Sequence, residues 1–585
     1  MNQPNLTFRH DLNHTASHIL AYAVKTIYPT AKLGMGPSID DGFYYDFDFA
    51  NPLKIEDLAK IECEMERIIK QNLEITHFEK SRTEAAKILD SGAEPYKLEL
   101  LADLPKGEKP SFYKMGEFAD LCAGPHIDKT GRIKAFRLTK ITGAYWRADA
   151  KNKMLTRIYG VAFEKKSQLE EYLAWQEEIK RRDHNKIGRE LGLFTTVDIV
   201  GQGLIHFLPK GSKIMQTMQR FVEDEEERRG YSHVKTPLMA KRDMYQLSGH
   251  WKVYKDGMFV IGDERLDDEV FALRPMACPF HFFLYKHELR SYRDLPIRYA
   301  ETGIMFRNEN SGEMHGLTRM RQFTMSEGHI VCRPDQMESE AAAWLDMFSF
   351  FMSALGMSER ITYRLSKWDP NDKNKYLGEP KVWDEAQSAL RKILKSSGLK
   401  FVEADGEAAF YGPKIDIQAK NIYGKEDTIA TLQLDLQSPE RYDMEFINEN
   451  GDRVRPIVFH RASVGAYERI LALVIENCAG AFPVWLAPTQ AVVMGISNKM
   501  DDYVGGVFEK LWASGLRVNK DIRGEKVGLK IREHTMKKVP YLLIAGEREA
   551  EANLVSVRTR EGADLGAMTI EAFLNIVNDK IKKFK

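Results

Sequence analysis

The sequence predicts a multidomain α+β protein. Its 585 residues are enough for about three to five domains of ordinary size. Strand-like runs gather in the middle of the chain instead of alternating strictly with helices, which favours antiparallel sheets over βαβ repeats. The last segment, 486–585, carries short apolar strands and helices in the order β-α-β-α-β-β-α, typical of a small mixed α/β domain.

The elements divide the chain into four parts. Residues 1–163 open with a helical stretch, HTASHILAYAVKTIY, followed by a Gly-aromatic strand, GFYYDFDFA, helices over 55–90 and short strands with Gly and Pro turns. The charged segment 164–191 predicts one long helix that serves as a connector. Residues 192–485 hold strands such as YAETGIMFRNE and RPIVFHRASVG, and the Pro- and Trp-containing AFPVWLAPTQ ends this region.

Composition narrows the class of protein. Formal net charge is zero, with 85 basic and 85 acidic residues, which argues against a uniformly basic nucleic-acid binder but allows the basic stretch 519–540. No run approaches the ~18–20 apolar residues of a membrane span. The first residues have no apolar leader, so the chain is expected to be cytoplasmic.

The cysteines argue against a disulfide framework. They are few, odd in number and scattered, so metal binding or catalysis is the better expectation for any that matter. They are Cys63, Cys122, Cys278, Cys332 and Cys478.

A hairpin over 298–323 is the first candidate site. A strand, a polar turn and a second strand place Arg307 and Glu309 on one face, because side chains alternate with period two. Arginine there suits a phosphate and glutamate suits an adenine amino group. Read alone, the spacing favours an exposed hairpin with surface ion pairs, because such pairs usually signify little.

Histidines and cysteines form the second set of candidates. His14 and His18 are four residues apart in a helical stretch, and Cys122 and His126 have the same spacing. Together they suit a four-ligand zinc site, but two unrelated structural pairs would look the same.

Three longer segments then identify a family. The segments 235–251, 298–323 and 458–473 resemble, in order and spacing, the three signature motifs of class II aminoacyl-tRNA synthetases. HIGH and KMSKS sequences are absent, so class I does not fit. Within class II the chain resembles bacterial-type threonyl-tRNA synthetases, and the similarity covers essentially its whole length. The segments that carry this resemblance are RPMACPFHF, SGEMHGLTRMRQFT, FYGPKI, LQLDLQSPERY and FHRASVGAYERI.

This resemblance implies a domain organisation and an activity. Residues 1–163 would be an editing domain, 164–191 the connector, 192–485 a class II catalytic domain on an antiparallel sheet, and 486–585 an anticodon-binding domain. The chain would activate L-threonine with ATP, transfer it to tRNA(Thr) and hydrolyse mischarged Ser-tRNA(Thr). A homodimer and ATP in complex with Mg²⁺ are implied too.

The resemblance also assigns roles at the synthetic site. Arg307 would contact the α-phosphate, Glu309 the adenine amino group and Phe323 the base, while Arg319 and Arg469 would hold the outer phosphates. Positioning and charge neutralisation suffice for such a transfer, without a covalent nucleophile. Further residues expected around the amino acid and the reacting groups are Met325, Glu327, Tyr411, Lys414 and Gln433.

A zinc ion is implied beside them. Cys278, His329 and His460 match the family's zinc ligands, although their spacing alone indicates nothing. Three protein ligands leave zinc an open position that the threonine amino and hydroxyl groups would fill. Valine lacks the hydroxyl and would be rejected, whereas serine lacks only a methyl and would be discriminated by about 1–3 kcal/mol.

Four positions depart from the family pattern. Phe280 stands where a glycine is usual, Met325 replaces a glutamine, Glu327 replaces an aspartate, and Gly524 stands where an asparagine is common. The first three adjoin the expected zinc pocket.

Weak serine rejection calls for a second site. The N-terminal segments resemble the editing domain of threonyl enzymes, which implies an editing cluster and leaves a second zinc open. The residues assigned to editing are His14, His18, Lys97, Asp120, Cys122 and His126.

The C-terminal segment resembles an anticodon-binding domain. Arginine and glutamate suit base edges, and lysine suits phosphates. The residues assigned to the anticodon are Lys526, Arg532, Glu549 and Arg558. The small ubiquitin-like domain that precedes editing in many relatives is expected to be absent.

Two other functions are weighed against this one. A tRNA-binding paralogue or free-standing deacylase would be expected to lack the ATP arginines, and the sequence keeps them. An enzyme for serine or another hydroxy amino acid is suggested by Met325 and Glu327.

Overall fold

The computed structural model describes residues 9–105, 107–149, 151–267, 269–372, 375–376 and 379–584. The chain divides into two compact units, 2–178 and 179–585, and each is described by itself. None of the described helices is long and apolar enough to cross a membrane.

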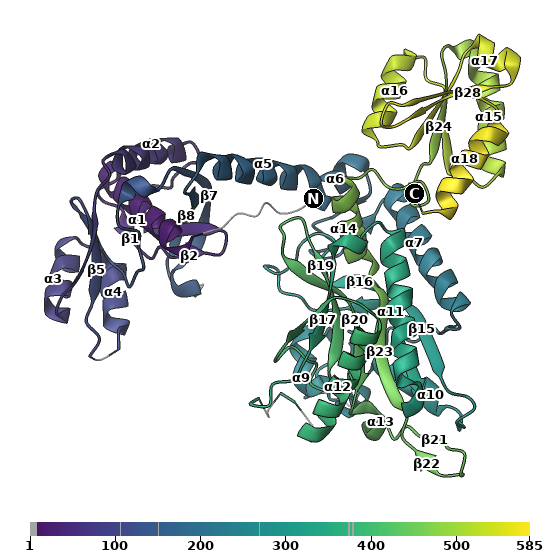
Figure 1. The fold of residues 1–585 in the computed structure, drawn as a ribbon, viewed down its shortest axis with the longest axis horizontal. Coiled ribbons are helices and arrows are strands. Elements are labelled where there is room, and N and C mark those ends of the chain that lie inside the picture. Colours follow the sequence, from purple (N-terminus) through teal and green to yellow (C-terminus); the bar gives the residue numbers. More distant parts are fainter. Residues whose placement is uncertain are drawn as a thin grey trace. The chain divides into compact units, whose positions relative to one another are not determined.

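The first unit is built on helix α1 (His10–Ile27), which packs against a five-stranded sheet (Figure 1). Ala16, Ile19 and Leu20 of α1 are fully buried against the aromatic strand β3 (Gly42–Asp48), so this apolar stripe fixes the helix on the sheet. The other strands of this sheet are β1 (Lys32–Leu33), β2 (Ser38–Ile39), β7 (Ala135–Tyr145) and β8 (Met154–Phe163). Helix α2 (Asp57–Lys70) packs beside α1.

A smaller sheet completes this unit. Strands β4 (Ile75–Glu79), β5 (Ser111–Met115) and β6 (Phe118–Leu121) form it, and helices α3 (Arg82–Ser91) and α4 (Pro95–Asp103) pack on it around Phe112. The helices predicted over 55–90 are present, but β4 lies between them, so the prediction missed one strand.

The segment predicted as one long helix over 164–191 is two helices, α5 (Lys166–Arg182) and α6 (His184–Leu191). Asp183 separates them, and its side chain accepts a hydrogen bond from the backbone N–H of Lys186. Aspartate at this position satisfies a free amide at the start of a new helix, which a continuous polar pattern conceals.

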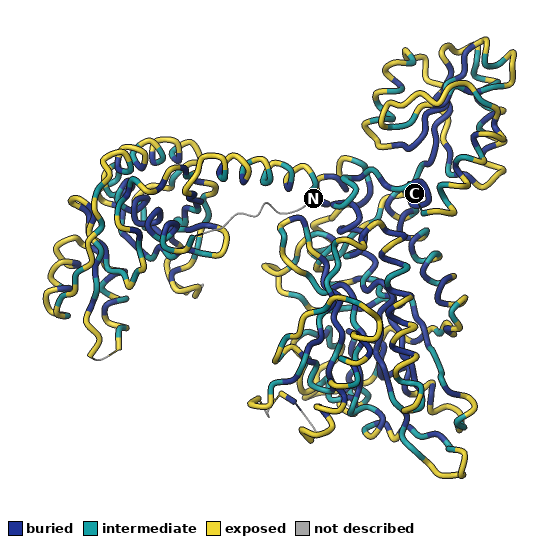
Figure 2. Tube along the Cα trace, viewed as in Figure 1, coloured by how far each residue is buried: buried dark blue, intermediate teal, exposed yellow. Residues whose placement is uncertain are grey.

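The second unit contains an eight-stranded sheet that is antiparallel except at its edges. In spatial order its strands are β11 (Ser232–His233), β15 (Ile297–Phe306), β16 (Gln322–Cys332), β23 (Ile457–Ala466), β20 (Glu426–Asp435), β19 (Lys414–Lys420), β17 (Ile361–Ser366) and β18 (Phe401–Ala404). Helices α11 (Met337–Ala354) and α14 (Tyr467–Cys478) cover one face, and α10 (Cys278–Lys286) packs on the other. Helix α7 (Pro209–Arg228) runs beside α14. Buried residues follow the central strands (Figure 2).

The chain ends in a five-stranded sheet of order β25-β24-β26-β27-β28. Strand β24 (Ala491–Gly495) turns alternate side chains to two faces: α15 (Asp501–Ala513) and α18 (Ile570–Lys582) cover one, and α16 (Val527–Met536) covers the other. The remaining strands are β25 (Val518–Asp521), β26 (Tyr541–Ala545), β27 (Val555–Thr559) and β28 (Asp564–Met568). The structure adds helix α17 (Glu547–Ala552) and strand β28 to the predicted order.

Candidate active sites

Strand β16 organises the first site. Phe323, Met325, Glu327 and His329 occupy alternate positions along it, so their side chains leave the same face. A bulge in the pairing with β23 falls between Ser326 and Glu327. This row of side chains has a cavity at its Phe323 end and a histidine–cysteine cluster at its His329 end. The side chains of Met325 and Glu327 lie between the two.

The cavity at the Phe323 end gathers the residues expected to bind ATP. Arg307 and Glu309 lie just beyond the end of β15 rather than within it, and the Arg307 guanidinium is 5.1 Å from the Phe323 ring. The residues that line the cavity include Arg307, Glu309, Thr318, Arg319, Phe323, Met325 and Arg469.

Charge concentrates in this cavity. Arg319 pairs with Glu309 through Nε and Oε2, 2.8 Å apart. Burial, and then repulsion from Arg307, lowers the pKa of Arg469. Arg307 Nε is buried without a hydrogen-bond partner among the described residues. Cations held close together in this way suit the phosphates of a nucleotide.

Cys278, His329 and His460 meet at the other end of the row. His329 and His460 are directly paired across β16 and β23, and Cys278 begins α10 on the same face. His329 Nε2 lies 3.0 Å from His460 Nδ1, which is 3.2 Å from Cys278 Sγ. The three ligand atoms lie within 4.8 Å of one another, and the 3.0 and 3.2 Å separations are near the ~3.3–3.6 Å spacing around a tetrahedral zinc ion.

The other ring nitrogen of His329 and the other ring nitrogen of His460 each contact a further side chain. His329 Nδ1 is 2.8 Å from His281 Nδ1, and His460 Nε2 is 2.6 Å from Asp435 Oδ2. Burial alone would raise the pKa of Asp435, but hydrogen bonds with His460 and Ser438 hold that pKa below its usual value. Outer partners of this kind fix the tautomer and direction of metal-ligating imidazoles, so the residues present fit a zinc ion.

The residues expected around the amino acid lie beside the cluster. Tyr411 OH donates a hydrogen bond to Gln433 Oε1, and the Tyr411 ring is 5.1 Å from the His460 ring. Glu327 accepts hydrogen bonds from the Ala277 backbone at 3.2 Å and from Cys278 Sγ at 3.4 Å. Lys414 pairs with Asp416 at 2.9 Å.

Three residues near this cluster were not predicted from the sequence to belong to the site. His281 follows Cys278 by three positions on α10, a spacing that could have revealed it. Asp435 reaches His460 only through strand pairing, which no local pattern indicates. His250 lines the same cavity as Cys278 and His460, and burial, followed by His460, lowers its pKa to about 4.

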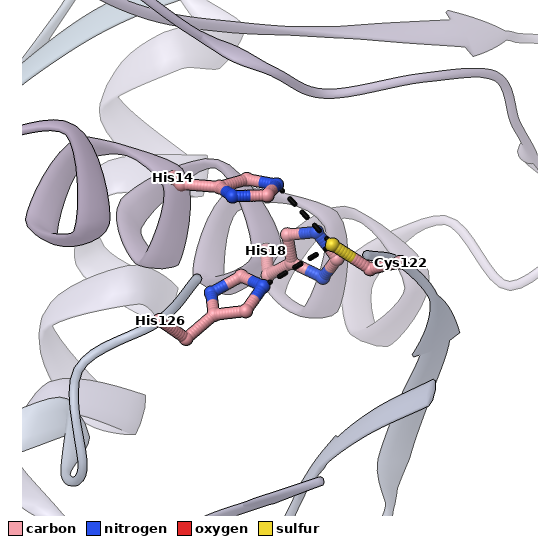
Figure 3. A group of neighbouring side chains, drawn as sticks. All are labelled: His14, His18, Cys122 and His126. Carbon is pink, nitrogen blue, oxygen red and sulfur yellow. Dashed lines mark hydrogen bonds between the residues drawn. The ribbon is translucent and has the colours of Figure 1, made fainter. Parts of the chain in front are cut away.

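The editing candidates also come together (Figure 3). His14 and His18 project from α1, while Cys122 and His126 lie after β6, and one atom of each falls within 4.8 Å of the others. Cys122 Sγ is 3.3 Å from His14 Nε2 and 3.3 Å from His126 Nε2. Figure 3 shows the three rings arranged about the sulfur atom.

Lys97 and Asp120 form the buried wall of this cluster. Their Nζ and Oδ1 atoms are 2.8 Å apart. Asp120 also accepts a 2.5 Å hydrogen bond from Tyr45 OH, a contact that no sequence signal predicted. His18 Nδ1 is 3.5 Å from the same carboxylate. All six residues assigned to editing are thus in one place.

Burial keeps this cluster uncharged. Burial, and then His10, lowers the pKa of His14 to about 4, and burial with His18 and His14 lowers that of His126 to about 2. Burial raises the pKa of the Cys122 thiol to about 11. Near neutral pH the imidazoles are therefore uncharged, and the Cys122 thiol is protonated and so a poor nucleophile.

The anticodon candidates are more dispersed. Lys526 precedes α16, Arg532 lies on α16, Glu549 on α17 and Arg558 on β27. Glu549 accepts hydrogen bonds from Gly546 N and Ser556 Oγ. No hydrogen bond or ion pair within the described part of the chain joins the four. A side chain at Gly524 would meet only Asn498 Nδ2, at 3.8 Å.

Comparisons with known proteins give the class first. Residues 259–478 match the tRNA synthetase class II core domain (G, H, P, S and T), and residues 490–580 match the anticodon binding domain. Residues 111–159 match the threonyl and alanyl tRNA synthetase second additional domain.

Individual relatives narrow this class. The chain is 55% identical to a threonine–tRNA ligase of Clostridium perfringens over 97% of its length and 88% of that protein, and 46% identical to one of Oceanobacillus iheyensis over 98% and 89%. It is 33% identical, with a TM-score of 0.64, to the RNA binding domain of threonyl-tRNA synthetase from Cryptosporidium parvum, covering 68% of this chain and 98% of that one. The chain therefore belongs to the threonine–tRNA ligase family.

Proposed function

We propose that this chain activates L-threonine with ATP along strand β16 and transfers it to tRNA(Thr). The observation that carries the proposal is the row Phe323, Met325, Glu327 and His329, which joins the arginine-lined cavity to the histidine–cysteine cluster. A nucleotide at one end and an amino acid at the other would bring the carboxylate and the α-phosphorus together near Met325.

Each residue of the cavity would contact a different part of ATP. Phe323 would stack on adenine, and Glu309 would accept from its amino group. Arg307 would neutralise charge on the α-phosphate as the carboxylate oxygen bonds to phosphorus and pyrophosphate leaves. Arg319 and Arg469 would hold the outer phosphates, with Mg²⁺ accompanying ATP.

The residues around the cluster would hold the amino acid. Cys278, His329 and His460 would hold a zinc ion, which supplies an open coordination position for the threonine amino and hydroxyl groups. Glu327, Tyr411, Gln433 and Lys414 would line this position. In the transfer step, the 3′-terminal hydroxyl of tRNA would attack the carbonyl carbon and AMP would leave. Neutral His250, which lines the same cavity as Cys278 and His460, would take the proton.

We further propose that the N-terminal unit hydrolyses Ser-tRNA(Thr). Water would attack the ester carbonyl, and a neutral imidazole of His14, His18 or His126 would accept its proton. As the C–O bond to the tRNA breaks, the imidazolium would return that proton to the leaving tRNA oxygen. Lys97, oriented by Asp120, would stabilise the developing negative charge.

The domain limits, the anticodon contacts and a homodimer complete the proposal. The four segments keep the limits 163, 191 and 485, and the anticodon would contact Lys526, Arg532, Glu549 and Arg558. Helix α7 and the strand before Pro237 would form the dimer interface. Light scattering of the purified chain is expected to give twice the 67.2 kDa chain mass; a monomer would contradict the dimer.

Amino-acid-dependent ATP–pyrophosphate exchange tests the synthetic proposal. Threonine should support exchange, valine should not, serine should support it weakly, and a strong chelator should abolish it. Absence of exchange with all three amino acids would overturn the ligase proposal. A preference for serine over threonine would overturn the specificity and point to Met325 and Glu327.

A further inference from the structure

A fully buried histidine stands where α6 begins. His184 is 0% exposed, and its two ring nitrogens have different partners. The backbone N–H of Leu317 donates to Nε2 at 3.2 Å, and Nδ1 lies 2.7 Å from Glu476 Oε1. Because a backbone N–H can only donate, Nε2 carries no proton in this bond, so Nδ1–H donates to the carboxylate.

Leu317 belongs to the loop that carries the proposed ATP ligands. This loop, 307–321, contains Arg307, Glu309 and Arg319. Its next residue, Thr318, accepts a 3.0 Å hydrogen bond from Arg469 Nε through its carbonyl oxygen. Two consecutive residues of the loop are therefore anchored through their backbones.

Both anchors lead to the same helix. Arg469 and Glu476 lie about two turns apart on α14. Arg469 holds the Thr318 carbonyl directly, and Glu476 holds the Leu317 amide through the His184 ring. The loop is thereby fixed in position relative to α14, which itself contributes Arg469 to the ATP cavity.

The loop also fits closely against α6. Gly316 has a φ of +48°, and a Cβ there would lie 2.3 Å from His184 Nε2 and 2.2 Å from Asn185 Oδ1. No side chain fits between the loop and the ring. A displacement of His184 would therefore be transmitted to the loop.

We propose that His184 is a positioning residue for ATP binding, which holds the 307–321 loop so that Arg307 and Arg319 face the nucleotide. This inference rests on the proposed function, because it takes the arginine cavity as the ATP site. A buried histidine that only stabilises the core would have the same burial, so the test separates loop position from fold stability.

Two amide substitutions separate the two hydrogen bonds. The His184→Gln amide oxygen reaches the place of Nε2 and keeps an acceptor for Leu317, whereas the His184→Asn amide nitrogen sits near Nδ1 and keeps only the donor to Glu476. If His184 positions the loop, His184→Asn raises the KM for ATP about tenfold, which is the effect of one lost buried hydrogen bond. His184→Gln should stay within about threefold of the wild type, with the KM for threonine little changed in both.

Hydrogen exchange of the peptide covering 307–321 gives a readout independent of activity. His184→Asn should accelerate exchange there more than His184→Gln does, at matched thermal stability. Equal KM values for ATP in both variants, or equal changes in the KM values for ATP and threonine, would overturn the positioning role. Gly316→Ala pushes the loop away from the ring and should reproduce the rise in the KM for ATP. It serves as the test if His184→Asn does not fold. An unchanged KM for ATP in Gly316→Ala would overturn the positioning role of His184. An inactive wild type would instead overturn the proposed function.

Discussion

Two clusters of histidine and cysteine in this chain look alike in composition and differ in their surroundings. In the cluster of Cys278, His329 and His460, the outer nitrogens of both rings are held by His281 and Asp435. In the cluster of His14, His18, Cys122 and His126, the buried Nδ1 atoms of His14 and His18 have no hydrogen-bond partner among the described residues.

Nearby charge separates the clusters further. The carboxylates of Glu327 and Asp435 contact the first cluster and favour a cation there. The second cluster adjoins the ion pair of Asp120 and Lys97, in which the carboxylate is matched by an ammonium group. After burial, this ammonium group is the largest cause that lowers the pKa of His18. We infer that the first cluster suits zinc and the second suits proton transfer to and from water. Ligand type alone does not define a metal site.

The largest expected effect is on amino-acid activation. Cys278→Ala should reduce threonine-dependent pyrophosphate exchange more than about a hundredfold, because loss of a ligand exceeds the loss of an outer partner. Deacylation of Ser-tRNA(Thr) should remain. Cys332→Ala removes a buried thiol from β16, the strand that carries His329, and is the matched control. Equal losses in both variants would contradict a metal-binding role for Cys278.

The reverse pattern is expected in the editing cluster. His18→Ala should lower Ser-tRNA(Thr) deacylation about a hundredfold, within the range of general acid–base catalysis. Cys122→Ala should lower it too, because the Cys122 sulfur contacts the rings of both His14 and His126. Threonine-dependent exchange should be unchanged, and Ser-tRNA(Thr) should accumulate during aminoacylation. If neither variant accumulates it, the editing assignment is wrong.

The outer partner of His460 gives an intermediate effect. Asp435→Asn should weaken zinc affinity about 10–100-fold in competition with a chromogenic chelator. Asp427→Asn, on the same strand and bonded to Asn421, is the control. Equal affinities in the two variants would show that the Asp435 contact does not tune the metal site.

The smallest expected effect is on stability against acid. The pKa of His14 is lowered from its ordinary 6.5 to about 4 in the folded chain. The unfolded chain therefore binds a proton first, and stability present above about pH 6.5 is lost progressively as pH falls toward 4. The His14 contribution at about pH 5.5 is roughly 1 kcal/mol. Hydrogen exchange of α1 in the full chain should quicken from pH 7 to 5.5 after correction for intrinsic rates, and less so in His14→Gln; identical responses would contradict the lowered pKa.

Long periodic segments were predictable from the sequence. The helix around His14 and His18 and the strand–loop–strand segment around Arg307 and Arg319 appear as expected, because burial imposes a 3.6- or 2-residue period on them. The break at Asp183 was missed because a single capping side chain interrupts an otherwise helical polar pattern.

The residues of the candidate zinc site were predictable from the sequence, but the residues that contact them were not. Family resemblance indicated Cys278, His329 and His460, which the fold brings together from α10, β16 and β23. Asp435, Tyr45 and the His184–Leu317 contact depend on tertiary pairing between distant segments, and no local pattern carries that information. The roles of Phe280, Met325 and Glu327 in specificity stay predictions.

The zinc content of three purified chains tests the contrast between the two clusters most directly. Elemental analysis should find about one zinc per chain in the wild type, about one in Cys122→Ala, and almost none in Cys278→Ala. Two zinc ions per wild-type chain, or loss of zinc in Cys122→Ala with retention in Cys278→Ala, would contradict the account.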